Sequence, residues 1–310
     1  MPSDTVQFGL LTPSDLWRKS VAEKQATLMA VEEAGFSHLY LADHVSFRDG
    51  SGNDGFVDVA ALSQLHDRLK VMTSIYLLPL RHPLPVARQV QTMDKVASGR
   101  FMFGIGIGGE DRHEVEICGV DPATRGQRTD EMLEIIQRLL DSETLDFAGH
   151  HFQLQAARLK PALRNPVPIF VGGRSNAALR RAARFGTGWV GVWCSTRRYA
   201  EAVTMIAEQA EGFGRDVQWQ HGYQPWLGLD SDPDKAREVV KAGMEAFYHV
   251  PFEQFERYTP FGTPAQVAES LAPYAEAGCR MFNLKVCTTH VEEEVPLAQE
   301  LVSEMRKLIG

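Results

Sequence analysis

The sequence predicts an α/β protein, a single (β/α)8 barrel of the TIM type, and three observations support this prediction. Short apolar segments alternate with amphipathic helical stretches along the 310 residues. The apolar segments are rich in Val, Ile, Leu, Phe and Tyr and are bounded by Gly, Pro or Asp, as buried parallel strands usually are. No linker rich in Pro, Gly or Ser divides the chain. We therefore expect one barrel domain over residues 1–310, and an open, doubly wound sheet is the alternative that the same alternation allows.

The expected strands and helices follow each other in chain order. The strands are Val6–Leu11, His38–Ala42, Val71–Leu77, Phe101–Ile105, Pro168–Val171, Gly188–Val192, Gly222–Leu229 and Met281–Val286. The helices are Lys19–Ala34, Pro83–Ala97, Gln127–Leu140, Asn176–Phe185, Arg197–Glu211, Pro233–Tyr248 and Pro296–Leu308. The first helix stops at Gly35, a suitable residue after a helix end, and the second starts on a proline that fits a first turn.

Two connections are longer than the usual loop between elements. Asp141–Val167, after the fourth strand, contains a predicted hairpin formed by Thr144–Phe147 and His151–Leu154 with its turn at Gly149. Tyr248–Gly262, near the seventh strand, is rich in aromatic residues. Long loops inside a compact domain often form lids or binding segments, so we expect insertions with a functional role at both places.

Composition narrows the class of protein. The chain has 32 Lys and Arg against 40 Asp and Glu, a net charge of −8, and an acidic surface repels the phosphate backbone of nucleic acids. No apolar run reaches the ~18–20 residues that span a bilayer, and the first residues lack the pattern of a signal peptide. Four cysteines without metal-binding spacing are typical of a reducing cytoplasm. We therefore expect a cytoplasmic protein that binds a small-molecule substrate, with no nucleic-acid, membrane or metal partner.

The ends of two strands carry residues suited to chemistry, because a barrel places its active site at the carboxyl ends of its strands. The second strand ends in LADHV, which brings Asp43 and His44 to the mouth, and histidine moves protons near neutral pH. A structural Asp-His pair that caps the strand is the equally plain alternative. The fourth strand runs into GIGIGGE, where glycines allow a planar ligand to approach the backbone and Glu110 places a carboxylate at the rim.

The segment VPIFVGGRSN predicts a phosphate site. A buried strand ends at Gly172–Gly173, and Ser175 or Asn176 can cap the following helix. Free backbone N–H groups, the positive end of a helix and Arg174 together attract a phosphate. The alternative is an ordinary strand-to-helix turn that needs two glycines for tight packing.

Taken together, these motifs resemble the luciferase-like family of flavin and deazaflavin oxidoreductases. The matching segments are ADHV, RHPLPVARQVQTMDKVASGRFMFGIGIG, RGQRTDEMLEIIQRLL, PVPIFVGGRSNAALRRAARFGTGWV and FGTPAQVAESLAPYAEAG, in the family's order over roughly residues 6–290. The resemblance implies a TIM-type barrel with an insertion after the fourth strand. It agrees with the strand count made from the residues alone.

The resemblance also implies roles for particular residues. The family binds its ring across the barrel mouth against a bulged, often cis, peptide of the third strand, where this chain has Ser74 and Ile75. Asp43 and His44 match the residues that meet the ring and the substrate, and Glu110 resembles a glutamate that assists the histidine in deazaflavin-dependent sugar-phosphate dehydrogenases. The other cofactor-binding positions are Gly106, Ile107 and Gly108 beside the ring, and Gly172, Gly173, Arg174 and Ser175 at the phosphate.

The resemblance leaves the cofactor open between two chemistries. We expect the deazaflavin coenzyme F(420), with hydride transfer to or from a hydrophobic alcohol, ketone or enone and with His44 moving the substrate proton. The alternative is a two-component monooxygenase that uses reduced FMN, O₂ and a reductase partner, and a second alternative is a non-catalytic flavin-binding protein. The family also implies a homodimer, for which the apolar stripe of Val57–Leu65 offers a surface.

Overall fold

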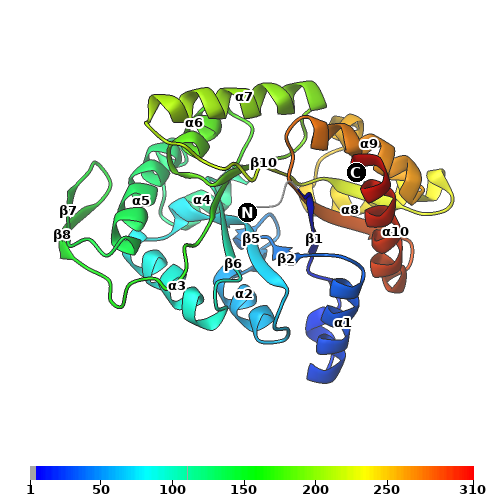
Figure 1. Cartoon of the computed structure of the whole chain (residues 1–310), viewed down its shortest axis with the longest axis horizontal. Coiled ribbons are helices and arrows are strands. Elements are labelled where there is room, and N and C mark those ends of the chain that lie inside the picture. Colours follow the sequence, from blue (N-terminus) through cyan, green and yellow to red (C-terminus); the bar gives the residue numbers. More distant parts are fainter. Residues whose placement is uncertain (1–4, 110) are drawn as a thin grey trace.

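Eight positions of parallel strand close into a barrel in the computed structural model, which describes residues 5–109 and 111–310 (Figure 1). Strand β14 pairs with β1, so the sheet has no open edge at that seam and the doubly wound alternative is wrong. The barrel strands are β1 (Gln7–Leu11), β2 (His38–Leu41), β5 (Lys70–Leu77), β6 (Phe101–Gly106), β9 (Ile169–Gly172), β10 (Gly188–Gly191), β11 (Gly222–Tyr223) with β12 (Trp226–Leu229), and β14 (Met281–Thr288). Each lies within two residues of an expected strand, and the predicted fold class is confirmed.

The seventh barrel position is a strand interrupted at its centre. The prediction of one strand over Gly222–Leu229 is right in extent, but Gln224 and Pro225 separate β11 from β12. Both pieces pair with β14 in one register, Gly222 with Met281 and Trp226 with Lys285. A proline has no N–H to donate to the sheet, which explains why the pairing lapses at this point.

Helices surround the barrel and follow its strands in alternation. They are α1 (Val21–Glu33), α2 (Gly55–Ser63), α3 (Pro83–Val96), α5 (Arg125–Leu140), α6 (Asn176–Phe185), α7 (Thr196–Gly212), α9 (Pro264–Glu276) and α10 (Glu294–Ile309). Capping boxes fix two of the starts, Ser20 with Glu23 before α1 and Thr263 with Gln266 before α9. The sequence-based assignment of helices missed α2, α9 and the short helix over Arg112–Ile117.

The apolar stripe of Val57–Leu65 mostly faces inward in α2. Val59 and Leu62 are buried against the barrel, whereas Val57 is 66% exposed. The stripe is therefore explained by packing within the chain, and the homodimer stays a prediction. None of the helices in the described part of the chain is both long and apolar enough to cross a membrane.

Insertions follow three of the barrel strands. After β2 comes the antiparallel hairpin β3 (His44–Phe47) and β4 (Ser51–Asn53). After β6 come α4 (Arg112–Ile117) and, beyond α5, the predicted hairpin, observed as β7 (Leu145–Ala148) and β8 (Gln153–Ala157) at the outer edge of the molecule (Figure 1). After β12 come α8 (Pro233–Tyr248), two short 3-10 turns (Phe252–Gln254 and Glu256–Tyr258) and β13 (Phe261–Gly262). The insertions expected after the fourth strand and near the seventh are both present.

The interior of the barrel has an apolar floor. Its buried side chains come from six different strands: Tyr40, Met72, Met102, Phe170, Val190 and Met281. A larger cluster fills the space between the barrel and the helices. Residues above this floor, at the carboxyl ends of the strands, line the mouth.

Candidate active site at the barrel mouth

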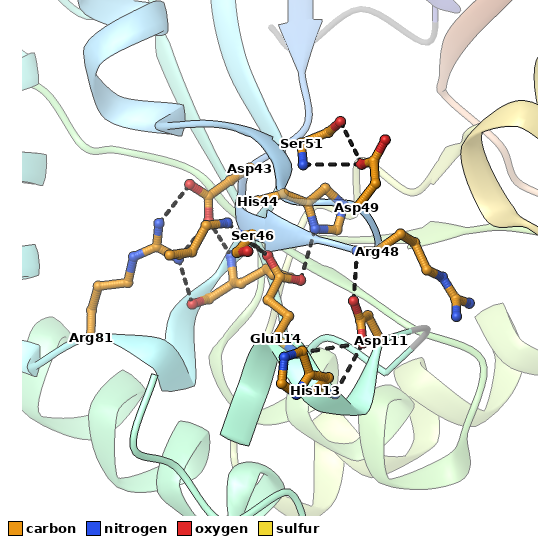
Figure 2. A network of polar contacts seen from close by, with 12 residues as sticks. Asp43, His44, Ser46, Arg48, Asp49, Ser51, Arg81, Asp111, His113 and Glu114 are labelled. Atoms are coloured by element: carbon orange, nitrogen blue, oxygen red, sulfur yellow. Dashed lines mark hydrogen bonds and ion pairs between the residues drawn. The ribbon is translucent and has the colours of Figure 1, made fainter. Parts of the chain in front are cut away.

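A histidine-carboxylate pair lies beside the mouth. His44 opens β3 directly after β2, and its Nδ1 is 3.0 Å from Oε2 of Glu114 (Figure 2). Because an ionised carboxylate only accepts, Nδ1 carries the proton and Nε2 of the neutral ring is an acceptor. The His44 side chain is 18% exposed and that of Glu114 only 3%. The imidazole is therefore held in one tautomer while part of it stays accessible.

Glu114 is kept ionised by the hairpin that it supports. Its Oε1 accepts hydrogen bonds from the backbone N–H groups of Val45, at 2.7 Å, and Ser46, at 3.1 Å. Burial alone would raise the pKa of this carboxyl, but the bonds from His44, Ser46 and Val45 together lower it below its ordinary value. Asp111 fixes α4 in the same way, since it caps the helix and accepts from the backbone of Arg48 at 2.7 Å (Figure 2).

Aromatic rings flank the imidazole. The ring centroid of Phe47 lies 4.3 Å from that of His44, and the centroid of Phe247 lies 6.0 Å away. Phe47 and Phe247 stack on each other at 5.1 Å. Since Phe247 belongs to α8, the insertion after β12 contacts His44, although the two are far apart in the sequence. These rings limit the access of water to the pair.

Asp43 is part of a buried ion pair. It has no exposed surface, and its oxygens accept from Gly55 N at 3.0 Å, from Leu77 N at 2.9 Å and from the Arg81 guanidinium at 2.6 and 2.7 Å. Burial raises the pKa of Asp43, and Arg81 with the two N–H groups opposes that rise. In the structure, Asp43 therefore links the end of β2 to the start of α3. A contact between Asp43 and a cofactor ring stays a prediction.

The bulge expected in the third strand is present in β5. The register of β5 against β6 shifts between Thr73 and Tyr76, and the peptide bond between Ser74 and Ile75 is cis. The Ile75 side chain lies against two glycines. A Cβ on Gly106 would be 2.5 Å from its Cγ2, and a Cβ on Gly172 would be 2.9 Å from its Cδ1. Ile75 and the two glycines therefore form one continuous apolar surface across three strands.

The turn between β9 and α6 brings a glycine with positive φ, a helix start and an arginine together. Gly173 has a φ of +123°, and its carbonyl accepts from Trp189 Nε1 at 2.7 Å. Ser175 caps α6 by accepting from Ala178 N at 3.2 Å. The Arg174 guanidinium lies over the Trp193 ring, 5.2 Å from its centroid. A positive helix end and an exposed guanidinium thus adjoin each other.

A second arginine lies beside this turn. Arg198 of α7 donates to the Asn176 side chain at 2.9 Å, at the start of α6. Nearby, Nε1 of Trp193 is buried and has no hydrogen-bond partner among the described residues. Two guanidinium groups beside one helix start fit a phosphate. The neighbouring surface of Ile75 and the two glycines fits a planar ring, so the residues present suit a flavin-type cofactor.

The structure brings several of the predicted site residues together at one rim of the barrel. Gly106 and Gly172 adjoin Ser74–Ile75, and Ile107 and Gly108 continue from β6 at the same rim, Gly108 with a φ of +69°. Glu110 lies outside the described residues. Sequence analysis missed Glu114 and Phe247 as site residues. For Glu114 a signal existed, because Asp111 followed three residues later by a glutamate is the pattern of a helix start.

The fold and the site define a TIM-barrel protein with a histidine-carboxylate pair beside the mouth, an apolar surface at Ile75 and a strand-to-helix turn flanked by two arginines. The chain belongs to the luciferase-like monooxygenase family, whose model matches residues 6–259. The family resemblance seen in the sequence is confirmed. Its members include oxidoreductases that act with F(420) as well as monooxygenases.

Individual relatives are more distant. An uncharacterized protein of Mycobacterium tuberculosis is 33% identical over 180 residues, which cover 52% of this chain and 62% of that protein, less than two thirds of its length. An F(420)-dependent glucose-6-phosphate dehydrogenase of Kineococcus radiotolerans is 25% identical over 279 residues, 80% of this chain and 82% of the dehydrogenase. The structure of an F(420)-dependent secondary alcohol dehydrogenase in complex with an F(420)-acetone adduct superposes with a TM-score of 0.83 at 19% identity, covering 97% of this chain and 99% of that one. At such identity, this last likeness establishes the fold.

Proposed function

We propose that this protein is an F(420)-dependent oxidoreductase that transfers a hydride to or from a small hydrophobic alcohol, ketone or enone. The observation that carries the proposal is the pairing of His44 with Glu114 beside the apolar surface of Ile75. Such a pair handles a substrate proton, which hydride transfer between an alcohol and a ketone requires. The similarity to an F(420)-dependent dehydrogenase over 80% of the chain supports the choice of cofactor.

The residues divide the binding of the cofactor between them. Ser74, Ile75, Gly106, Ile107 and Gly108 would hold the ring, with Asp43 behind the bulge. The second set would bind the phosphate: Gly172, Gly173, Arg174 and Ser175. When bound, F(420) supplies a ring carbon that accepts or donates the hydride.

His44 and Glu114 would manage the proton. Nε2 of His44 takes the proton from a substrate hydroxyl or returns it to a carbonyl, and the ionised Glu114 stabilises the imidazolium that forms. Phe47 and Phe247 exclude water from this exchange and favour an apolar substrate. Glu110 keeps its proposed assisting role.

A monooxygenase that uses reduced FMN and O₂ is the second candidate. The family model is that of luciferase-like monooxygenases, which favours it. The ring surface and the phosphate turn suit FMN as well, so these residues alone support both cofactors. A flavin-binding protein without activity is the third candidate.

Turnover separates the three candidates. The purified protein is incubated without oxygen with F(420) and a panel of secondary alcohols, and with reduced F(420) and ketones or enones, while the absorbance of the oxidised coenzyme is followed. We expect coenzyme-dependent turnover that falls about 10²–10⁴-fold in His44→Ala. Turnover only with reduced FMN and O₂ would favour the monooxygenase, and none under either condition would favour the binding protein.

A further inference from the structure

A chain of buried hydrogen bonds crosses the barrel below the mouth. Nε2 of His38 in β2 is 2.8 Å from Oδ1 of Asn283 in β14, and Nδ2 of Asn283 donates to Oγ of Ser74 in β5 at 3.3 Å. Ser74 Oγ donates to Oε1 of Gln224 at 2.6 Å, and Gln224 Nε2 returns a bond to the Ser74 carbonyl at 3.3 Å. Residues up to 245 positions apart thus form one path that ends on Ser74.

The protonation of His38 determines how the Asn283 amide is oriented. Burial lowers the pKa of His38 to about 4, so its ring is neutral at pH 7. Because Asn283 Oδ1 only accepts, His38 carries its proton on Nε2, and its Nδ1 is left as an acceptor 2.9 Å from the Ser37 hydroxyl, whose one proton is shared between this nitrogen and the Phe8 carbonyl at 3.1 Å. This order fixes the Asn283 amide, which directs the Ser74 hydroxyl toward Gln224. A buried network with all members satisfied holds its atoms rigidly.

The path acts on the bulge of β5. Gln224 lies at the interruption between β11 and β12 and reaches across the barrel to both the hydroxyl and the carbonyl of Ser74. That carbonyl belongs to the peptide unit that carries Ile75. Ile75 in turn fills the space in front of Gly106 and Gly172. Gln224 is partly exposed, whereas His38, Ser74 and Asn283 are at most 1% exposed, so it is the upper member of the path.

We infer that Gln224 is a positioning residue for the cofactor ring. Its two hydrogen bonds hold Ser74 in place, and this keeps the Ile75 side chain against Gly106 and Gly172. The inference rests on the proposed function only in that a ring lies on Ile75, and it applies to F(420) and FMN alike. No contact between Gln224 and the ring is required.

The test measures ring binding separately from phosphate binding. The probes are the deazaflavin riboside and riboflavin, which have the rings of F(420) and FMN without a phosphate, titrated by fluorescence into the wild type and Gln224→Met. Methionine keeps the size of the side chain but removes both bonds to Ser74. We expect the Kd of the preferred riboside to rise at least about fivefold, with a shifted absorption spectrum of the bound ring. The matched control is Gln137→Met, which removes a glutamine bond to the Phe185 carbonyl at the opposite end of the barrel and leaves the Kd unchanged.

A double-mutant cycle tests whether Gln224 acts through Ser74. In Ser74→Ala, the hydroxyl is absent, and we expect Gln224→Met to weaken riboside binding less than it does in the wild-type background. Equal effects in both backgrounds, or a Gln224→Met variant that binds as the wild type does, would overturn the inference alone. A wild type that binds F(420) or FMN but neither riboside would overturn the inference alone, and one that binds none of the four would overturn the proposed function and this inference with it. Should Gln224→Met fail to fold, Gln224→Glu replaces it, since it loses only the donor to the Ser74 carbonyl and weaker binding is again expected.

Discussion

His44 donates its Nδ1 proton to Glu114 across 3.0 Å, and the other oxygen of Glu114 holds the strand that begins with His44. The same carboxylate therefore orients the imidazole and the backbone from which it projects. Because Glu114 is buried and ionised, it favours a positive charge on the ring when Nε2 takes up a proton. The pair has the features of a general base and the group that orients it.

Replacing Glu114 by Gln lowers turnover without preventing folding. An amide carries no negative charge, so the imidazolium loses its stabilising partner, and we expect kcat to fall at least about tenfold. Steady-state kinetics with the best substrate from the alcohol and ketone panel provides the measurement. Glu116→Gln is the control, since Glu116 lies on the same helix and pairs with exposed Arg112. Equal kcat values in the two variants would remove Glu114 from the mechanism.

Breaking the Asp43–Arg81 pair destabilises the fold. In Arg81→Met, the Asp43 carboxylate stays buried without its partner, and we expect the free energy of unfolding to drop by about 3–5 kcal/mol. Urea unfolding measures the loss. Arg112→Met is the control, because its partner Glu116 is exposed and such pairs contribute less than about 1 kcal/mol. A loss of similar size in both variants would contradict the structural task given to Asp43.

A methyl group on Gly106 displaces Ile75 and weakens cofactor binding. The added Cβ would be 2.5 Å from Ile75 Cγ2, closer than any real contact, so the Ile75 side chain must move. We expect Gly106→Ala to raise the cofactor Kd about tenfold, and Ile75→Ala in the same chain to recover part of the loss by vacating the space. Fluorescence titration of the single and double variants decides the matter. A double variant weaker than either single one would show that Ile75 is not the residue displaced.

Glu294 makes stability depend on pH. This first residue of α10 is 8% exposed, and burial raises its pKa from 4.5 to about 7. Between these values, the unfolded chain has released the proton that the folded protein still holds, so stability falls as pH rises from about 4.5 to 7 and stays low above that. We expect Glu294→Gln, which lacks this titration, to gain about 3 kcal/mol on the wild type between pH 4 and pH 8.

Urea unfolding of both proteins at several pH values tests this dependence. The control is Glu292→Gln, which removes the carboxylate of an exposed glutamate two residues earlier. A stability difference between Glu294→Gln and the wild type that does not change with pH would mean that folding does not raise the pKa of Glu294.

The sequence predicts the barrel well because its signal is local. The apolar pattern of a buried strand or an amphipathic helix of ordinary length is recognisable within about a dozen residues, and the alternation of these elements implies the closed sheet. Helix α9 is harder to read, since Pro273 lies inside it, and α2 is only nine residues long. The interruption of the seventh strand at Gln224–Pro225 depends on a partner across the barrel, which no local pattern reveals.

The candidate site is only partly readable for the same reason. The family motifs assign Ser74–Ile75 and the two glycine segments to one cofactor, and the structure brings Ile75 against Gly106 and Gly172. Glu114 lies 70 positions from His44, and Phe247 belongs to an insertion whose path over the mouth depends on packing. From its neighbours in sequence, Asp43 is predicted to be an exposed acid. Its pairing with Arg81, which the sequence does not reveal, allows it to be buried.

Direct titration of the purified protein with F(420) and, separately, with FMN tests the central claim most directly. Tryptophan quenching follows binding, because Trp193 lies beside the phosphate turn, and the fluorescence of each ligand gives an independent signal. We expect F(420) to bind at least about tenfold more tightly than FMN, and we expect Arg174→Ala to weaken the binding of F(420). Tighter binding of FMN would contradict hydride chemistry on a deazaflavin and favour the monooxygenase that uses reduced FMN and O₂.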